Sequence, residues 1–266
     1  MKRVGVISLL ILSAGARLAA GQDIVESSID GYGYQGVFDG DGAIRINSFG
    51  NSWVHPSRLG FSIGGIGHLA EFSNYLSINN GRVEKTGDSG WGWSVVGPLA
   101  IEGGTATSTV QRQDALQITF TQTVRDNGGG LVDWFLSAVF TNLSDGELDV
   151  CYFPYLDYDL FGTQLNDTAT YSAVDNDFVS PAVRVRKLGR EEVFVFVDLD
   201  GFSTEWRIRE WSPSSSDPLL SGQSCVTLGD MVTPFGPGDF TSAYKFPLAL
   251  APGETVAIDL QLGRFQ

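Results

Sequence analysis

The sequence is poor in the residues that build metal and nucleophilic sites. Its 266 residues include only two cysteines, two histidines and two methionines. His55 and His68 are too few to form a histidine cluster, and Cys151 and Cys225 lie far apart, so a zinc site is not expected. No G-x-S-x-G motif is present, which leaves a serine nucleophile without support.

Positive charge is scarce as well. The chain has 17 Lys and Arg against 31 Asp and Glu, a formal net charge of -14. Such a field makes nucleic acid and anionic membrane surfaces poor partners, whereas cations, neutral polymers and basic partners remain compatible with it. After the first residues no window approaches eighteen apolar residues, so no transmembrane anchor is expected in the mature chain.

The N-terminus has the pattern of a secretory signal peptide. Lys2-Arg3 precedes an apolar run over residues 4–12 that is too short to span a bilayer, and small residues follow up to Gly21. We expect residues 1–21 to be removed and a single domain over residues 22–266 to be exported, to the periplasm or the extracellular space. The leader has three basic residues and no acidic one, so the net charge of the mature chain becomes about -17.

Strand patterns and turn signals alternate along the mature chain. Apolar and polar residues alternate over residues 43–49, 107–113 and 182–188, for example, and Asp39-Gly40 and Asn80-Gly81 are typical of tight hairpin turns. No amphipathic helix of ten residues or more is evident. About fourteen to sixteen candidate strands result, so we expect an all-β fold, a large two-sheet antiparallel sandwich with little helix.

The stretch over residues 131–167 has the longest strand pattern and the densest group of carboxylates. Both faces of residues 131–141 are largely apolar, which indicates a central strand covered on both sides. Ser144-Asp145-Gly146 then predicts a hairpin turn. The returning strand leads into one tyrosine and three acids: Tyr155, Asp157, Asp159 and Asp167. We therefore expect this hairpin to deliver several acids to one place.

Cys151 and Cys225 can form one intramolecular disulfide, which export would permit. The bridge would close a loop of about 75 residues and stabilise the protein by about 4 kcal/mol if it acts through chain entropy. The alternative is that both are small buried hydrophobic residues on separate strands. A Cα separation above about 7 Å would exclude the bridge.

Asp157 and Asp159 are the main candidates for chemistry. In an extended segment they share one face with Cβ atoms about 7 Å apart, and a glycosidase needs two carboxyl groups about 5 to 10 Å apart. Tyr155 on the same face could stack on a sugar. Two acids so close also repel each other unless Arg184, Arg186 or a bound Ca²⁺ lies between them.

Calcium is the cation for which the sequence offers ligands, because it prefers hard oxygen donors. The candidate donors are Asp157, Asp159, Asn166, Asp167, Asp175 and Asp177. A solvated acidic rim is the alternative interpretation of the same residues. Aromatic rings could add contacts to a neutral glycan, with Trp91 and Trp93 as candidates beside Trp53, Trp206 and Trp211, while Trp134 has the position of a core residue.

Two segments resemble a known architecture. FTNLSDGELDVCYFPYLDYDLFGTQLND over residues 140–167 and PLALAPGETVAIDLQL over residues 247–262 are similar to segments of large secreted bacterial β-sandwich proteins, including supersandwiches of the galactose mutarotase-like kind. Proteins of that shape include sugar epimerases, polysaccharide lyases, glycoside-cleaving enzymes and domains that only bind. The resemblance implies that a histidine and a carboxylate would act on the sugar ring, and His68, with Glu71 nearby in sequence, is the candidate.

We expect an exported, soluble binding or structural module that recognises carbohydrate or a cell-surface polymer. The alternative is a carbohydrate-active enzyme of the epimerase, lyase or glycosidase type that uses Asp157 or Asp159 with a second acid or His68. A third hypothesis is a structural component of a surface or matrix. The sequence carries no signal for a particular oligomeric state.

Overall fold

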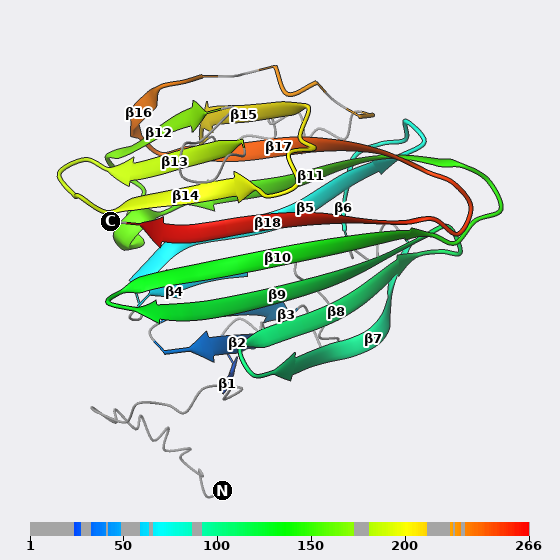
Figure 1. Cartoon of the computed structure of the whole chain (residues 1–266), viewed down its shortest axis with the longest axis horizontal. Coiled ribbons are helices and arrows are strands. Elements are labelled where there is room, and N and C mark those ends of the chain that lie inside the picture. Colours follow the sequence, from blue (N-terminus) through cyan, green and yellow to red (C-terminus); the bar gives the residue numbers. More distant parts are fainter. Residues whose placement is uncertain are drawn as a thin grey trace, which may run out of the picture.

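The computed structural model describes residues 24–27, 33–40, 42–48, 59–63, 66–86, 92–172, 181–211, 224–225, 227–229 and 232–265. These residues form eighteen strands and one 3-10 turn, η2 (Leu160–Gly162), with all strand pairs antiparallel. The expected all-β two-sheet sandwich is confirmed (Figure 1). Strands exceed the expected number because short ones such as β6 (Glu84–Lys85) and β16 (Phe235–Gly238) are too brief to show an alternating pattern.

Sheet I has nine strands. Its order is β1 (Ile24–Ser27), β2 (Gly33–Asp39), β3 (Gly42–Ser48), β4 (Leu59–Ile63), β5 (Ile66–Ile78), β11 (Leu148–Tyr158), β17 (Phe240–Leu250) and β15 (Glu205–Glu210), with β6 paired to β5. Its central strands β5, β11 and β17 come from distant parts of the sequence. Most of their hydrogen bonding therefore depends on long-range contacts.

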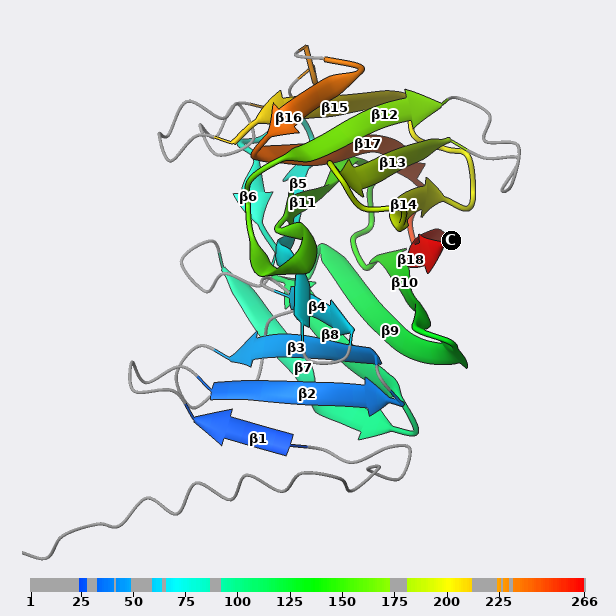
Figure 2. The ribbon, with the colours of Figure 1, turned by 90° about the vertical axis from the view of Figure 1, so that its left-hand side faces the viewer.

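Sheet II also has nine strands. Its order is β16, β12 (Asp167–Ser172), β13 (Ala182–Lys187), β14 (Val193–Asp198), β18 (Thr255–Phe265), β10 (Leu131–Asn142), β9 (Leu116–Gly128), β8 (Thr105–Arg112) and β7 (Trp93–Glu102). Figure 2 shows the two sheets as layers, with β5 and β11 on one side and β14, β18 and β10 on the other.

The predicted hairpin between residues 131 and 153 is wrong. β10 pairs with β9 and β18 in sheet II, whereas β11 pairs with β5 and β17 in sheet I. The turn at Ser144-Asp145-Gly146 therefore carries the chain from one sheet to the other. Asn142 fixes this crossing, because its buried amide donates to the carbonyl oxygens of Gly146 and Leu250 at 2.7 and 2.8 Å.

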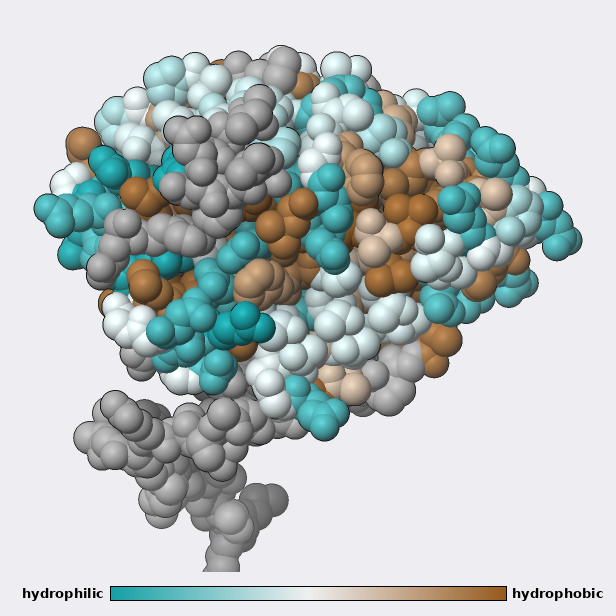
Figure 3. Space-filling view, in the orientation of Figure 1, coloured by the Kyte–Doolittle hydropathy of each residue, from teal (hydrophilic) through white to brown (hydrophobic). Residues whose placement is uncertain are grey.

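β10 is a central strand, as expected, but only one of its faces is fully covered. Trp134 and its alternate neighbours are buried, while Phe135, Ser137 and Val139 on the outer face are half-buried. The ring of Phe135 lies under Arg125, with the guanidinium carbon 5.5 Å from the ring centroid. Figure 3 views this side of the molecule, where apolar residues lie among polar ones over the central strands.

The core between the sheets is rich in aromatic rings. Trp134 meets Phe72 edge to face at 4.8 Å between centroids, and Phe140 meets Tyr152 at 5.0 Å. Both pairs join one sheet to the other and confirm the core position expected for Trp134, which is 1% exposed. Among the residues that the structure describes there is no helix with the length and apolar character needed to cross a bilayer.

Candidate functional site

The outer face of sheet I, opposite the core, is the candidate site. Along β11, Tyr152 and Leu156 belong to the core cluster, whereas Phe153 and Tyr155 belong to a separate apolar cluster outside it. Successive strand residues point to opposite faces, so Asp157 lies on the outer face with Tyr155. Tyr155 and Asp157, both named as candidates from the sequence, thus share one face of sheet I.

Two rows of residues cross the four strands β5, β11, β17 and β15 on this face. In the first row the register aligns Ser73, Tyr155, Ala243 and Arg207. In the second row it aligns Glu71, Asp157, Thr241 and Arg209. Directly opposed residues in antiparallel strands are about 5 Å apart at Cβ, so each row is a set of contacting neighbours. An acid, a hydroxyl and an arginine therefore follow one another across the second row.

Several polar groups of these rows are buried. Ser73 is 0%, Arg207 1% and Thr241 2% exposed, and Asp157 is half-buried. Burying a guanidinium is costly unless it has partners, so the burial of Arg207 is an unusual feature of this face. Asp157, Arg207 and Arg209 all have interaction partners in the structure.

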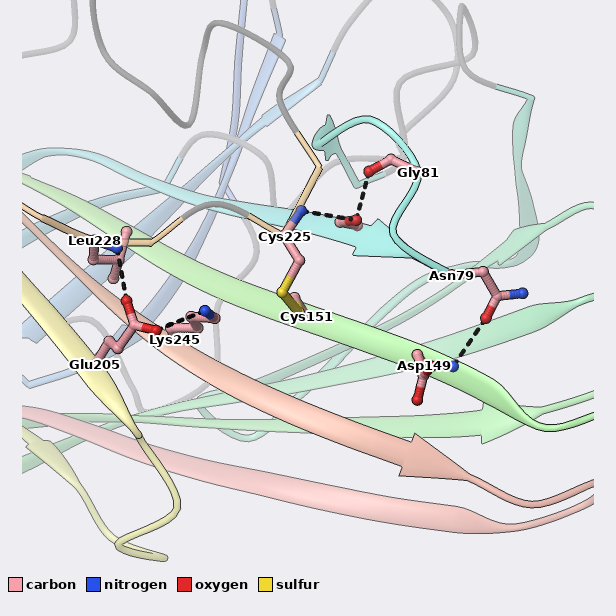
Figure 4. Close-up of a disulfide and its surroundings, with 9 residues drawn as sticks. Asn79, Gly81, Asp149, Cys151, Glu205, Cys225, Leu228 and Lys245 are labelled. Carbon is pink, nitrogen blue, oxygen red and sulfur yellow. Dashed lines mark hydrogen bonds and ion pairs between the residues drawn. A yellow bond between two sulfur atoms is a disulfide. The ribbon is translucent and has the colours of Figure 1, made fainter.

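One short segment lies on the same outer face, and we call it the strap: residues 224–225 and 227–229. The predicted disulfide between Cys151 and Cys225 is confirmed, with Cα atoms 5.7 Å apart, and it ties the strap to β11 (Figure 4). Leu228 N–H donates to Glu205 Oε2 at 2.8 Å, and Lys245 Nζ contacts Glu205 Oε1 at 2.7 Å. The strap therefore reaches from β11 to β15 and borders the two rows.

Asp159 lies at the end of the sandwich, past the last residue of β11. It occupies the position before η2 without a side-chain capping hydrogen bond, and its electrostatic neighbours are Lys187 of sheet II, Asp167 and Asp239. Burial raises the pKa of Asp159, and Lys187 opposes that rise. The structure thus groups Asp159 with Asp167 and places Asp157 in the row that ends at Arg209.

Asp167 anchors the connection between the sheets. It is fully buried, its Oδ1 lies 2.9 Å from Lys187 Nζ, and its Oδ2 accepts a hydrogen bond from Leu160 N–H at 3.3 Å. Burial raises the pKa of Asp167 to about 6 despite the lysine. In the described part of the chain no three His, Cys, Asp or Glu side chains are grouped so that they could hold a metal ion.

His68 is on β5 but faces the core. Its ring stacks on Phe194 of sheet II at 4.4 Å and meets Phe161 edge to face at 4.9 Å. The backbone N–H of Phe161 donates to Nδ1 at 3.2 Å, which assigns the ring proton of the neutral form to Nε2. Burial, helped by Arg264, lowers the pKa of His68 to about 4. His68 and Asp157 therefore lie on opposite faces of sheet I.

The tryptophans occupy different environments. Trp93 is 5% exposed and its Nε1–H donates to Glu84 Oε1 at 3.0 Å, so its ring is part of the core in this structure. Trp206 stacks on Tyr171 at 3.8 Å, and Trp211 is 39% exposed. Asn166 precedes β12, and its backbone carbonyl accepts a hydrogen bond from Leu188 N–H at 2.8 Å. Several residues named from the sequence lie outside the described residues: Trp53, His55, Trp91, Asp175, Asp177 and residues 1–21.

Sequence reasoning missed Arg207, Arg209 and Thr241 as neighbours of Asp157. The alternation of Arg207 and Arg209 with apolar residues was visible, but only the strand order β11, β17, β15 brings them to the acid. Arg184 and Arg186, considered from the sequence as the compensating charge, belong to β13 of sheet II.

Comparison with known proteins shows the fold. No family model matches the chain, and no curated protein matches its sequence. A galactose mutarotase-like protein from Clostridium acetobutylicum is similar in structure, with a TM-score of 0.55 and 9% identity over 93% of this chain and 99% of that one. A candidate aldose 1-epimerase from Escherichia coli K12 has a TM-score of 0.53 and 9% identity over 88% and 99% of the two chains.

A bacterial glucoamylase complexed with acarbose also contains this architecture. Its TM-score is 0.54, with 8% identity over 96% of this chain and 34% of the glucoamylase. At such identities the likeness is one of fold. The supersandwich, galactose mutarotase-like architecture expected from the sequence is confirmed, and these structural neighbours are carbohydrate-related proteins.

Proposed function

We propose that this chain is an exported protein that binds carbohydrate on the outer face of sheet I. The observation that supports this most directly is the pair of rows around Tyr155 and Asp157, which places a carboxylate and hydroxyls on central strands and guanidinium groups on the adjacent edge strand β15. Sugar hydroxyls both donate and accept hydrogen bonds. The carboxylate of the half-buried Asp157 supplies acceptors and the half-buried Arg209 supplies donors, while Arg207 and Thr241 are buried beneath this face.

The location of the groups favours binding by a rigid scaffold. The rows belong to β5, β11, β17 and β15, whose backbones are paired within one sheet, so the polar groups keep their relative positions. Preorganised groups lose little freedom when a ligand binds, which improves affinity. Tyr155 adds an aromatic ring next to these polar groups, an arrangement that suits a sugar ring with polar edges and an apolar face.

A carbohydrate-active enzyme is the second candidate, and one observation favours it. The register of β5 and β11 pairs Glu71 with Asp157, so two acidic residues occupy directly opposed positions on adjacent strands. Glycoside hydrolysis uses two carboxyl groups, one that protonates the leaving oxygen and one that acts as base or nucleophile. Asp157 would take one of these roles and Glu71 the other, without His68.

Glycan-array screening followed by calorimetry tests the binding proposal. We expect the wild type to bind at least one glycan, and Asp157→Asn to weaken that binding by about tenfold or more, since it removes a charged acceptor for sugar hydroxyls. Thr241→Val, at the buried position aligned with Asp157, should weaken the binding less. Thr119→Val on the outer face of sheet II is the matched control and should bind as the wild type does. The absence of binding to every glycan would overturn the proposal.

The two candidates separate when each bound glycan is incubated with the protein and its products are analysed. A binding protein leaves the glycan unchanged. An enzyme converts it, and Asp157→Asn should then abolish turnover while the protein stays folded by circular dichroism. Asp159→Asn serves as the comparison, because Asp159 lies with Asp167 and Lys187 instead of in the rows.

A further inference from the structure

The strap crosses the outer face of sheet I beside the proposed site. Cys225 is bonded to Cys151 of β11, and its backbone N–H donates to Ser77 Oγ of β5 at 3.3 Å. At the other end Leu228 N–H donates to Glu205 of β15 at 2.8 Å. Figure 4 shows these attachments on successive strands. The strap thus runs across the strands, parallel to the two rows.

An aromatic floor lies on the face that the strap crosses. Leu228 is 1% exposed and packs in one apolar cluster with Tyr75, Phe153, Tyr155 and Ala243. The rings of Tyr75 and Tyr155 meet edge to face at 6.0 Å. Tyr155 belongs both to this floor and to the first polar row, so the floor continues directly into the proposed glycan site.

The strap is separate from the main core. The apolar cluster between the two sheets contains Trp134, Phe72 and their neighbours but neither cysteine nor Leu228. The strap could therefore leave the outer face without opening the sandwich. Both cysteines are partly exposed, which lets a reductant reach the sulfur atoms.

We propose that the strap is a disulfide-locked cover on the aromatic floor of the site, and that an external dithiol opens it by reducing Cys151–Cys225. The effect on glycan binding rests on the proposed function, whereas the movement of the strap does not. One thiolate of the dithiol attacks a sulfur atom, the S–S bond breaks and a mixed disulfide forms. The second thiol then displaces the protein sulfur, so each cysteine gains one electron and one proton and the dithiol becomes a disulfide.

Opening changes what the site can bind. Departure of Leu228 removes one apolar side chain from the cluster that contains Phe153, Tyr75 and Tyr155, next to Asp157. Aromatic faces beside hydrogen-bonding groups suit a sugar ring, which has an apolar face and polar edges. If the oxidised cover is closed in nine molecules of ten, its release tightens glycan binding about tenfold.

Hydrogen exchange tests the movement without any ligand. The wild type is compared before and after reduction with a phosphine, which leaves no thiol adduct. We expect amides of the strap, including those of Cys225 and Leu228, to exchange at least about tenfold faster after reduction, because their hydrogen bonds become transient. Amides of β9 and β10 should stay protected. Unchanged exchange rates of the strap amides, or faster exchange throughout both sheets, would contradict the proposal that the strap is a cover released by reduction.

Affinity measurements test the consequence with the glycan identified on the array. Reduced wild type should bind about tenfold more tightly than oxidised protein. The double variant Cys151→Ala, Cys225→Ala should match the reduced affinity and ignore the phosphine. Leu228→Ala, which keeps the disulfide, should gain less. Equal affinity in both redox forms would contradict the proposed cover but leave glycan binding intact. If the strap opens on reduction and neither form binds a glycan, the proposed function alone is contradicted.

Discussion

At the scale of single residues, burial shifts the pKa values of two groups, His68 on β5 of sheet I and Asp167 on β12 of sheet II. His68 has Phe194 and Phe161 against its ring, and burial, with a contribution from Arg264, disfavours its charged form and lowers its pKa. Asp167 has the opposite response, since burial raises its pKa to about 6 even though Lys187 contacts it. His68 and Asp167 therefore titrate over overlapping pH ranges. As the pH falls, the lowered pKa of His68 reduces the free energy of unfolding, whereas the raised pKa of Asp167 increases it.

The pKa of about 4 for His68 predicts a loss of stability in acid. The unfolded chain takes up a proton near pH 6.5, whereas folded His68 does so only near pH 4, so the unfolded state binds more protons between these values. The contribution is fully present above pH 6.5 and is lost as the pH falls to 4, on the order of 3 kcal/mol. The raised pKa of Asp167 adds stability as pH falls from 6 and partly hides this loss.

His68→Phe isolates the effect, because it keeps an aromatic ring in the site and leaves Asp167 unchanged. Urea unfolding at pH 7 and pH 4.5 should show that the wild type loses about 2 kcal/mol more than the variant on acidification. His68→Phe also removes the acceptor for the Phe161 N–H, which lowers stability equally at both pH values. Parallel pH profiles for the two proteins would contradict the assignment of a buried neutral imidazole.

At the scale of the elements, one asparagine directs the crossing between sheets. Asn142 ends β10 and is fully buried, and its side chain both donates to Gly146 and Leu250 and accepts from the backbone N–H of Ser144 at 2.8 Å. These bonds join the end of a sheet II strand to the end of β17 in sheet I. The connection therefore has a defined geometry although it contains few residues.

Asn142→Ala should lower the free energy of unfolding by about 3 kcal/mol, since it leaves the buried Leu250 carbonyl without its donor and removes the cap on the turn. Asn142→Asp keeps the acceptor but loses both donated bonds, and should be at least as damaging at neutral pH. Thr141→Ala, whose hydroxyl pairs with Thr255 on the surface, is the control and should cost less than about 1 kcal/mol. Urea denaturation measures all three, and similar losses for Asn142→Ala and Thr141→Ala would argue against the role of Asn142.

At the scale of the whole molecule, two large sheets share one core and the disulfide staples only the outside of one sheet. The core cluster draws on strands of both sheets, from Phe61 on β4 to Leu262 on β18. The bridge joins residues 74 positions apart. Its main thermodynamic effect therefore falls on the unfolded chain, whose freedom it restricts.

Loss of the bridge should weaken the protein without abolishing its fold. The double variant Cys151→Ala, Cys225→Ala is expected to unfold in one cooperative transition with a free energy lower by about 4 kcal/mol, and to keep the circular dichroism of a β protein. Guanidinium titration of the purified variant measures the change. A variant without cooperative unfolding would show that the sandwich itself needs the staple.

Local pattern determined the class of fold. Alternation along residues such as those of β8 and β9, together with turn dipeptides, depends on neighbours in sequence, so the all-β sandwich and the core position of Trp134 could be predicted directly. The cysteine pair restricted the covalent choices to one bridge or none. Charge composition likewise follows from the sequence alone.

Which strands lie side by side was decided only in the tertiary structure. The Ser144-Asp145-Gly146 turn has the same local chemistry whether it joins strands in one sheet or crosses between two, so the hairpin prediction failed there. The residues that share a row with Asp157, namely Thr241 and Arg209, come from strands far away in the sequence. His68 and Asp157 lie on opposite faces of sheet I. Which face a strand residue occupies depends on the register of its strand, because a slip of one residue moves every side chain to the other face, and the register is set by pairing across the whole sheet.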